Sequence, residues 1–226
     1  MITSDCKPPQ TLLTYVTDLP TLREFLVETA PSMTVTSYLK ALIQSRPDRL
    51  LLRAKELSVS SYEALLLQLL PYTRAAGVEL IVSHHMHLAS TYNLPVQIGV
   101  AECEAILNSK ASNFGVSVHS LGEAETAIAA GAHWLVLGHI FPSRCKPGLT
   151  PRSAEECSSI LALAQKHNIP VHAIGGINFS TYAKVDEAFA GIYVMTETME
   201  QLHIDEYTAH WRQCLAHLIK HRACKP

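Results

Sequence analysis

In the stretch Trp134-Leu135-Val136-Leu137-Gly138-His139-Ile140-Phe141-Pro142-Ser143-Arg144-Cys145-Lys146-Pro147-Gly148-Leu149-Thr150-Pro151-Arg152, a short apolar run opens into a long polar loop. The first four residues are typical of a buried strand, because they are continuously apolar and end at a glycine. The loop then gathers glycine, proline, hydroxyl, thiol and cationic side chains, and such loops often carry binding or catalytic groups. We therefore predict a functional site at the exit from this strand.

Similar strands alternate with helical patterns along the chain. Segments with strand character lie at 11–17, 49–53, 78–82, 95–100, 114–118, 133–137, 169–174 and 190–195. Helical patterns lie at 22–43 (broken at Pro31-Ser32), 60–76, 101–107, 120–131, 153–166, 181–189 and in a last segment to about 219. Strands that alternate with helices through short connections predict parallel βαβ units. We expect an α/β fold, a (β/α)8 TIM barrel formed by residues 1–226 as one domain; a doubly wound open sheet is the alternative.

Composition narrows the class of protein. The chain has 226 residues, of which 48% are hydrophobic and 17% charged, with a formal charge of −2. No apolar run approaches the roughly 20 residues that span a bilayer, and the first residues lack a signal-peptide pattern, so we expect a cytoplasmic protein without a membrane partner. No cluster of Lys and Arg suggests nucleic acid. The six cysteines lack CxxC spacing and are expected to be reduced thiols.

Three closely spaced histidines, His84, His85 and His87, could suggest a metal site. However, adjacent residues at the end of a strand point apart, and no cysteine or carboxylate lies near them in the sequence. We therefore interpret this segment as a solvated loop and predict no metal ligands here.

In a TIM barrel, functional side chains lie after the carboxyl ends of the strands. This rule predicts that residues from six strands converge, namely Arg53, Lys55, Ser83, Ser117, His139, Gly175, Gly176 and Thr196. The Gly175-Gly176 pair and the Met195-Thr196 segment suit a phosphate, because glycines allow close approach and a following helix would present free N–H groups. A tight turn with positive φ is the alternative for the glycines.

The long loop offers one proton-transfer group and several polar ones. A histidine such as His139 can accept and release a proton at neutral pH, although a histidine that only bonds a loop carbonyl is the alternative. Cys145 lies between Arg144 and Lys146, whose charges would favour a thiolate; a small loop residue is the other interpretation.

Several of these motifs resemble a known superfamily. Ser117-Val118-His119-Ser120-Leu121-Gly122-Glu123-Ala124, the loop with Gly138-His139-Ile140-Phe141 and Cys145-Lys146, and Ala173-Ile174-Gly175-Gly176-Ile177 are similar to motifs of the thiamine phosphate synthase and TenI (thiazole tautomerase) superfamily. The resemblance covers about residues 113–197 and is thinner before them, where Leu52-Arg53-Ala54-Lys55 still fits. It implies a TIM barrel of the thiamine phosphate synthase type that binds a thiazole phosphate.

Departures from the synthase pattern favour the TenI branch. Synthases of this superfamily hold magnesium with an Asn-Asp pair after the third strand and an Asp after the fourth. Here these places read Ser83-His84 and Gln97-Ile98-Gly99-Val100-Ala101-Glu102, and Leu51 replaces a glutamine. The synthase loop Gly-Pro-Ile-Phe becomes Gly138-His139-Ile140-Phe141, and a cysteine precedes Lys146, as in TenI.

The resemblance thus implies a thiazole tautomerase that aromatises a carboxythiazole phosphate without metal or cofactor, with His139 as the proton shuttle. Substrate and phosphate would contact Arg53, Lys55, Ser117, Ser143, Cys145, Lys146, Gly175, Gly176, Met195 and Thr196. One alternative is a thiamine phosphate synthase, which would need Mg²⁺ to couple hydroxymethylpyrimidine diphosphate to thiazole phosphate. Another is a regulatory protein that binds thiazole phosphate without catalysis. The superfamily also implies a homo-oligomer.

Overall fold

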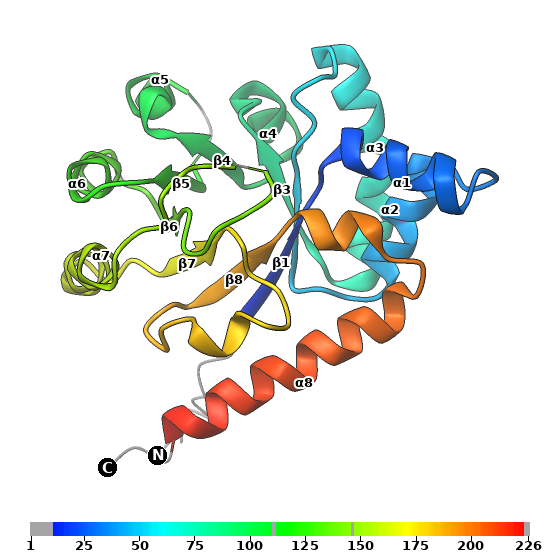
Figure 1. The fold of residues 1–226 in the computed structure, drawn as a ribbon. Coiled ribbons are helices and arrows are strands. Elements are labelled where there is room, and N and C mark those ends of the chain that lie inside the picture. The colour runs from blue at the N-terminus through cyan, green and yellow to red at the C-terminus, as the bar shows by residue number, and fades with distance from the viewer. Residues whose placement is uncertain (1–10, 110–111, 146, 224–226) are drawn as a thin grey trace, which may run out of the picture.

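Parallel strands close into a barrel in the computed structural model, which describes residues 11–109, 112–145 and 147–223, with side chains as far as residue 216 (Figure 1). The strands are β1 (Leu12–Val16), β2 (Arg49–Leu52), β3 (Glu79–Ser83), β4 (Val96–Gly99), β5 (Phe114–Val118), β6 (Trp134–Leu137), β7 (Val171–Ile174) and β8 (Gly191–Val194). Each pairs in parallel with the next, and β8 pairs with β1, so that Leu12 lies opposite Gly191. This closure confirms the TIM barrel and excludes the open sheet.

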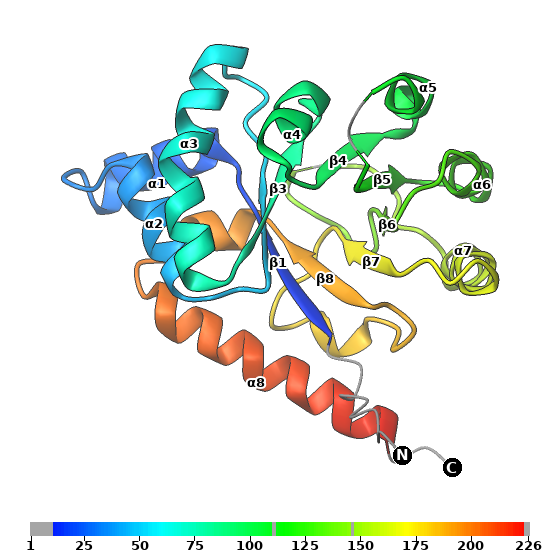
Figure 2. The same cartoon turned by 180° about the vertical axis from the view of Figure 1, so that it is seen from behind.

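Helices surround the barrel, with α1 to α3 on one side and α5 to α7 on the other (Figures 1 and 2). The α-helices are α1 (Leu19–Thr29), α2 (Val35–Gln44), α3 (Val59–Ala76), α4 (Met86–Tyr92), α5 (Cys103–Leu107), α6 (Leu121–Ala129), α7 (Ala154–Lys166) and α8 (Ile204–Ala223). Short 3₁₀ helices are η1 (Val100–Glu102), η2 (Tyr182–Lys184) and η3 (Thr196–Glu200). Helix α8 crosses the outside of the barrel and contacts α2 and η2. No helix in the described ranges is long and apolar enough to cross a membrane.

Serine side chains cap three of the helices. Ser120 and Ser153 accept hydrogen bonds from the N–H groups three residues further on and begin α6 and α7, as the sequence predicts. The cap of α3 is Ser58, two residues before the predicted start at Ser60. Gly77 ends α3 with a φ of 70°, a conformation that glycine adopts without strain.

Two predictions about helices are wrong. The helix expected at 181–189 is only the 3₁₀ turn η2; before it, the Asn178 side chain accepts hydrogen bonds from the N–H groups of Ser180 and Thr181. The segment after β3, expected to be a solvated loop, becomes helix α4 at Met86. This short helix buries Leu88 against the barrel, and such tertiary packing can order a segment of weak helical pattern.

The core has two layers. The larger layer lies between the strands and the surrounding helices and includes Leu50 and Leu52 of β2. The intervening residue, Leu51, points the other way and joins a separate apolar cluster inside the barrel, together with Val16, Ile81, Trp134, Val136 and Tyr193. Alternate residues of a strand face opposite sides, so each strand supplies both layers. The inner cluster fills the barrel beneath the carboxyl ends of the strands.

Candidate functional site

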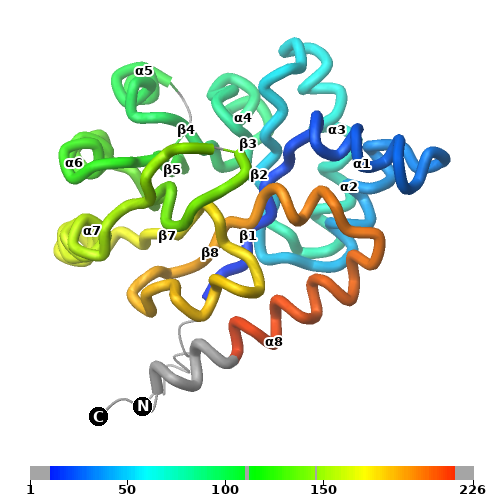
Figure 3. The backbone as a smooth tube through the Cα atoms, viewed as in Figure 1, coloured from blue at the N-terminus to red at the C-terminus, as the bar shows by residue number. Residues whose placement is uncertain are grey.

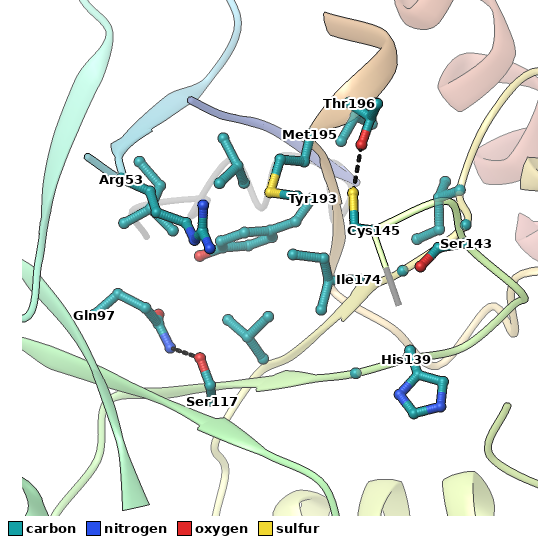
Figure 4. Close-up of a pocket in the computed structure, with 18 of the residues that line it drawn as sticks. Arg53, Gln97, Ser117, His139, Ser143, Cys145, Ile174, Tyr193, Met195 and Thr196 are labelled. Atoms are coloured by element: carbon teal, nitrogen blue, oxygen red, sulfur yellow. Dashed lines mark hydrogen bonds between the residues drawn. The ribbon is translucent and has the colours of Figure 1, made fainter. Parts of the chain in front are cut away.

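A cavity of about 620 Å³ lies at the carboxyl ends of the strands (Figure 4). Its lining includes residues from or after every strand, as expected for a TIM-barrel site. Most of the predicted site residues line it together, namely Arg53, Lys55, Ser83, Ser117, His139, Ser143, Cys145, Gly175, Gly176, Met195 and Thr196. The predicted contact Lys146 lies outside the described residues. The structure brings the others together around one cavity, and their roles stay predictions.

The cavity has two polar ends and an apolar middle, as Figure 4 shows. The polar groups labelled at one end are Arg53, which follows β2, Gln97 of β4 and Ser117 of β5. Polar groups of the other end come from the loops after β6 and β8, and they are Ser143, Cys145 and Thr196. Between them lie the larger apolar surfaces of Ile174, Tyr193 and Met195. The shape suits a flat ring that carries a polar group on each side.

Arg53 brings positive charge to the first end. Its backbone is held by Thr17, whose hydroxyl donates to the Arg53 carbonyl at 2.7 Å and accepts from the Arg53 N–H at 2.7 Å. Neither Arg53 nor Lys55 forms an ion pair with any residue that the structure describes. Arg144, by contrast, is paired with Glu200 at 2.6 Å. Because an unpaired cation in a cavity attracts anions, this end suits a carboxylate or phosphate.

The loop after β6 lies over the ends of β7 and β8. The described parts of this loop, which precede α7, can be followed in Figure 3. The N–H of Ile140 donates to the Ile174 carbonyl at 3.0 Å, and the Cys145 sulfur lies 2.7 Å from the Thr196 hydroxyl. The Arg144–Glu200 pair adds a further link to η3. These contacts place the predicted loop residues in the wall of the cavity.

Gly175 and Gly176 are needed for the packing of this loop. Both have positive φ, 103° and 63°. A Cβ on Gly175 would lie 2.7 Å from that of His139, and one on Gly176 would overlap the Pro142 carbonyl oxygen. The tight-turn interpretation is therefore confirmed. The structure also differs from the expected helix N-termini, because the first elements after β7 and β8 are the short 3₁₀ turns η2 and η3. Phosphate binding here stays a prediction that rests on the backbone of these turns.

His139 is the site residue whose placement differs most from expectation. Its side chain is directed away from the centre of the cavity, and the residue is only 4% exposed (Figure 4). The ring Nε2 donates to the Thr150 carbonyl at 2.6 Å, whereas Nδ1 is buried and has no hydrogen-bond partner among the residues that the structure describes. His139 therefore lines the cavity without pointing its ring into the centre, and its role as the proton shuttle stays a prediction. The observed bond is the one expected of a histidine that fixes a loop.

His84 and Glu102 form a pair that the sequence did not predict. The Nδ1 atom of His84 lies 2.5 Å from Oε2 of Glu102, which also accepts from the N–H of Gly99 at 2.8 Å. His84 lines the cavity and has a φ of 65°, an unusual value for a residue with a side chain. Because Glu102 occupies Nδ1, the other ring nitrogen, Nε2, is the one left for a ligand or a proton. The pairing was missed because the two residues follow different strands.

Glu197 and Gln97 also line the cavity and were not among the predicted site residues. Partial burial raises the pKa of the Glu197 carboxyl group, and the nearby Arg144 opposes that shift. A carboxylate directly after β8 was the available signal for Glu197. For Gln97, the signal was a polar side chain within the otherwise apolar run of β4.

Comparisons with known proteins agree with this geometry. A family model described as thiamine monophosphate synthase, TMP-TENI, matches residues 25–198. The chain belongs to the thiamine monophosphate synthase family. Curated relatives carry the name thiamine-phosphate synthase: the Roseiflexus sp. (strain RS-1) protein is 31% identical over 72% of this chain and 70% of its own length. The Chloroflexus aurantiacus protein is 35% identical over 66% and 69%, and the Salmonella typhimurium protein 26% over 91% and 96%.

Solved structures show the same fold within and beyond the family. The thiamine phosphate pyrophosphorylase from Pyrococcus furiosus superposes with a TM-score of 0.73 at 21% identity, covering 93% of this chain and 98% of that one. A 3-hexulose-6-phosphate synthase superposes with a TM-score of 0.56 at 14% identity, covering 90% and 99%. At these identities the likeness concerns the barrel fold alone, because one fold can carry many different chemistries.

Proposed function

We propose that this family member acts on a phosphorylated thiazole in thiamine biosynthesis and isomerises it, as a thiazole tautomerase does. The observation that carries the proposal is the pairing of His84 with Glu102. These residues lie after β3 and β4, where the synthases that this chain resembles carry magnesium-binding carboxylates. A site whose carboxylate is already bonded to a histidine favours a reaction that needs no metal-bound diphosphate.

The described residues do not fit a magnesium site of the synthase kind. Mg²⁺ prefers several oxygen ligands in octahedral geometry. At this place Glu102 is the carboxylate, and its Oε2 already accepts from His84 and Gly99. The described ranges contain no group of three or more His, Cys, Asp or Glu side chains arranged to hold a metal. The proposed reaction therefore includes no step that uses magnesium.

The cavity suits a carboxythiazole phosphate. The guanidinium of Arg53 and the hydroxyl of Ser117 offer donors for a carboxylate, whereas the turns at Gly176 and Thr196 offer backbone at the other end for a phosphate. The apolar middle accommodates the ring. Aromatisation removes a proton from one ring position and delivers one to another, so that no net charge or redox change occurs.

Two histidines are candidates for the proton transfer, which is typically worth about 10²–10⁴-fold in rate. His139 is the candidate from the resemblance, and in this structure its ring would have to exchange the Thr150 carbonyl for the substrate. His84 is the candidate from the geometry, because Glu102 holds one ring nitrogen and leaves the other available. The carboxylate would stabilise the charged imidazole during transfer.

A second candidate function is that of a thiamine-phosphate synthase. The names of the curated relatives, at 25–35% identity, favour it. Such an enzyme joins a pyrimidine diphosphate to a thiazole phosphate and releases pyrophosphate. The polar groups Arg53, Ser117 and Ser143 fit that substrate set as well.

One set of assays separates these functions. We expect the purified protein to accelerate aromatisation of the carboxythiazole phosphate tautomer equally with magnesium and with EDTA. Formation of thiamine phosphate from both synthase substrates, dependent on magnesium, would instead establish the synthase. If neither reaction is accelerated while thiazole phosphate raises the melting temperature, the protein is a non-catalytic binder. His84→Ala and His139→Ala, assayed side by side, identify the proton carrier as the variant that loses turnover and retains product binding.

A further inference from the structure

Three side chains from neighbouring strands form a chain of hydrogen bonds at the Arg53 end of the cavity. The Trp134 Nε1–H donates to Oε1 of Gln97 at 2.7 Å, and Nε2 of Gln97 donates to the Ser117 hydroxyl at 3.1 Å. Gln97 is only 4% exposed, so water contributes little to its bonding. Figure 4 shows its amide and the Ser117 hydroxyl side by side at the edge of the cavity.

The direction of each bond in this chain follows from the chemistry of the groups. An indole N–H can only donate, so the carbonyl end of the Gln97 amide must face Trp134. The amide nitrogen then faces Ser117 and can also only donate. The Ser117 oxygen is therefore an acceptor in this bond, and its own proton points elsewhere. No hydrogen bond within the described residues accepts that proton, and Ser117 lines the cavity.

Trp134 can hold Gln97 only because of a glycine on the adjacent strand. Gly115 of β5 lies opposite Trp134 of β6, and a Cβ at Gly115 would overlap the indole ring. The guanidinium of Arg49 packs over the same ring, 5.6 Å from its centroid. The orientation of the tryptophan is thus set from both sides, and the amide that it holds has one orientation.

We propose that Gln97 is a specificity-determining positioning residue, which fixes the Ser117 hydroxyl as a hydrogen-bond donor towards the cavity. Together with Arg53, the hydroxyl makes this end of the cavity a surface of donors. This end of the cavity therefore favours a ligand group that only accepts hydrogen bonds, such as a carboxylate, over groups that must donate. The inference deepens the proposed function by assigning the end that the substrate carboxylate occupies, but it concerns binding and not turnover.

The test compares the binding of two ligands and uses a variant that reverses the hydrogen bond between residue 97 and Ser117. The probes are the carboxylated thiazole phosphate and the same compound without its carboxylate, and the measurement is the dissociation constant by calorimetry. Gln97→Glu keeps the side-chain length, still accepts from Trp134 and accepts from Ser117 as well, so the hydroxyl proton turns away from the ligand. We expect about tenfold or greater weakening for the carboxylated probe and less than about threefold for the other.

A second background tests whether Gln97 acts through Ser117. In Ser117→Ala, the further change Gln97→Met should alter the affinity for the carboxylated probe by less than about twofold, because the group that Gln97 positions is gone. In the otherwise wild-type protein, which keeps Ser117, Gln97→Met should weaken binding of the carboxylated probe selectively. This comparison remains available even if Gln97→Glu does not fold. Equal weakening of both probes, or an effect that persists in Ser117→Ala, would show a merely structural role and overturn the inference.

An NMR measurement without ligand tests the hydrogen bond from Trp134 to Gln97 directly. The sequence contains two tryptophans, so Trp134→Phe assigns the two indole N–H signals in an NMR spectrum. The Trp134 signal should move upfield in Gln97→Met, because the methionine sulfur is a much weaker acceptor than the amide oxygen. An unchanged signal would overturn the inference. Failure of both probes to bind the wild type would overturn the inference and the proposed function together. Selective binding of the carboxylated probe without turnover would overturn the proposed function alone.

Discussion

Gly115 and Trp134 lie directly opposite each other on β5 and β6, and the indole ring occupies the space in which a side chain at position 115 would lie. This pairing brings a large aromatic residue into the inner cluster of the barrel. It also directs the indole N–H towards Gln97 at the base of the cavity. The packing of Trp134 inside the barrel thereby determines which groups at this end of the cavity donate hydrogen bonds.

Gly115→Ala should destabilise the protein by about 1–3 kcal/mol, because the added methyl group overlaps a ring that is held by its neighbours. Urea unfolding measures the change. The matched control is Gly122→Ala in α6, where a Cβ meets nothing within 4 Å, and there we expect stabilisation of up to about 1 kcal/mol. Equal stability of Gly115→Ala and wild type would mean that the indole can move aside freely.

His172 should make the protein less stable in acid. Burial lowers the pKa of this histidine from 6.5 to about 3, and the nearby positive charge of Arg49 adds to the effect. Below about pH 6.5, His172 therefore becomes protonated in the unfolded chain but stays neutral in the folded protein. This histidine leaves the free energy of unfolding unchanged above that pH. As the pH drops from there towards 3, it lowers the free energy of unfolding by about 1.4 kcal/mol per pH unit.

His172→Gln should remove that part of the acid dependence, which urea unfolding between pH 7 and pH 5 measures as a difference in slope between variant and wild type. His133→Gln, at an exposed histidine, serves as the control and should retain the wild-type slope. A wild-type slope in His172→Gln would show that other groups cause the acid sensitivity.

Arg53→Met should weaken binding of an anionic ligand by about 10–100-fold, since it removes a charge-assisted donor from one end of the cavity. Stability should change little, because Arg53 has no ion pair in the described part of the chain. Calorimetric titration with thiazole phosphate and its carboxylated form gives the affinities. Arg23→Met, which removes an exposed charge paired with Glu56 at 3.7 Å, should bind as the wild type does.

His139→Gln should distinguish fixation of the loop from proton transfer. Glutamine can donate to the Thr150 carbonyl as the imidazole does, but it cannot titrate near neutral pH. If His139 only fixes the loop, turnover should stay within about threefold of wild type, whereas loss of a proton carrier costs about 10²–10⁴-fold. Limited proteolysis of the segment after β6 provides the control for loop order, since a loosened loop would be cut faster.

Much of the fold could be predicted because it depends on repeated local patterns. Apolar strands such as Trp134–Leu137, separated by capped helices, admit few arrangements other than parallel βαβ units. The weak elements could not be predicted in the same way. After β7 the helical pattern yields only the short turn η2, and α4 forms where Leu88 packs against the barrel.

The sequence by itself determined the barrel and the convergence of residues such as Arg53, Ser117 and Thr196, since parallel strands bring their carboxyl ends to one face whatever the side chains are. Only the tertiary structure decided where individual side chains point. His139 turns to a carbonyl of its own loop, His84 meets a carboxylate from the next strand, and Gln97 is oriented by an indole two strands away. Each of these orientations depends on a donor or acceptor that folding brings near. The periodic pattern of apolar residues, which predicts strands and helices, carries no information about such partners.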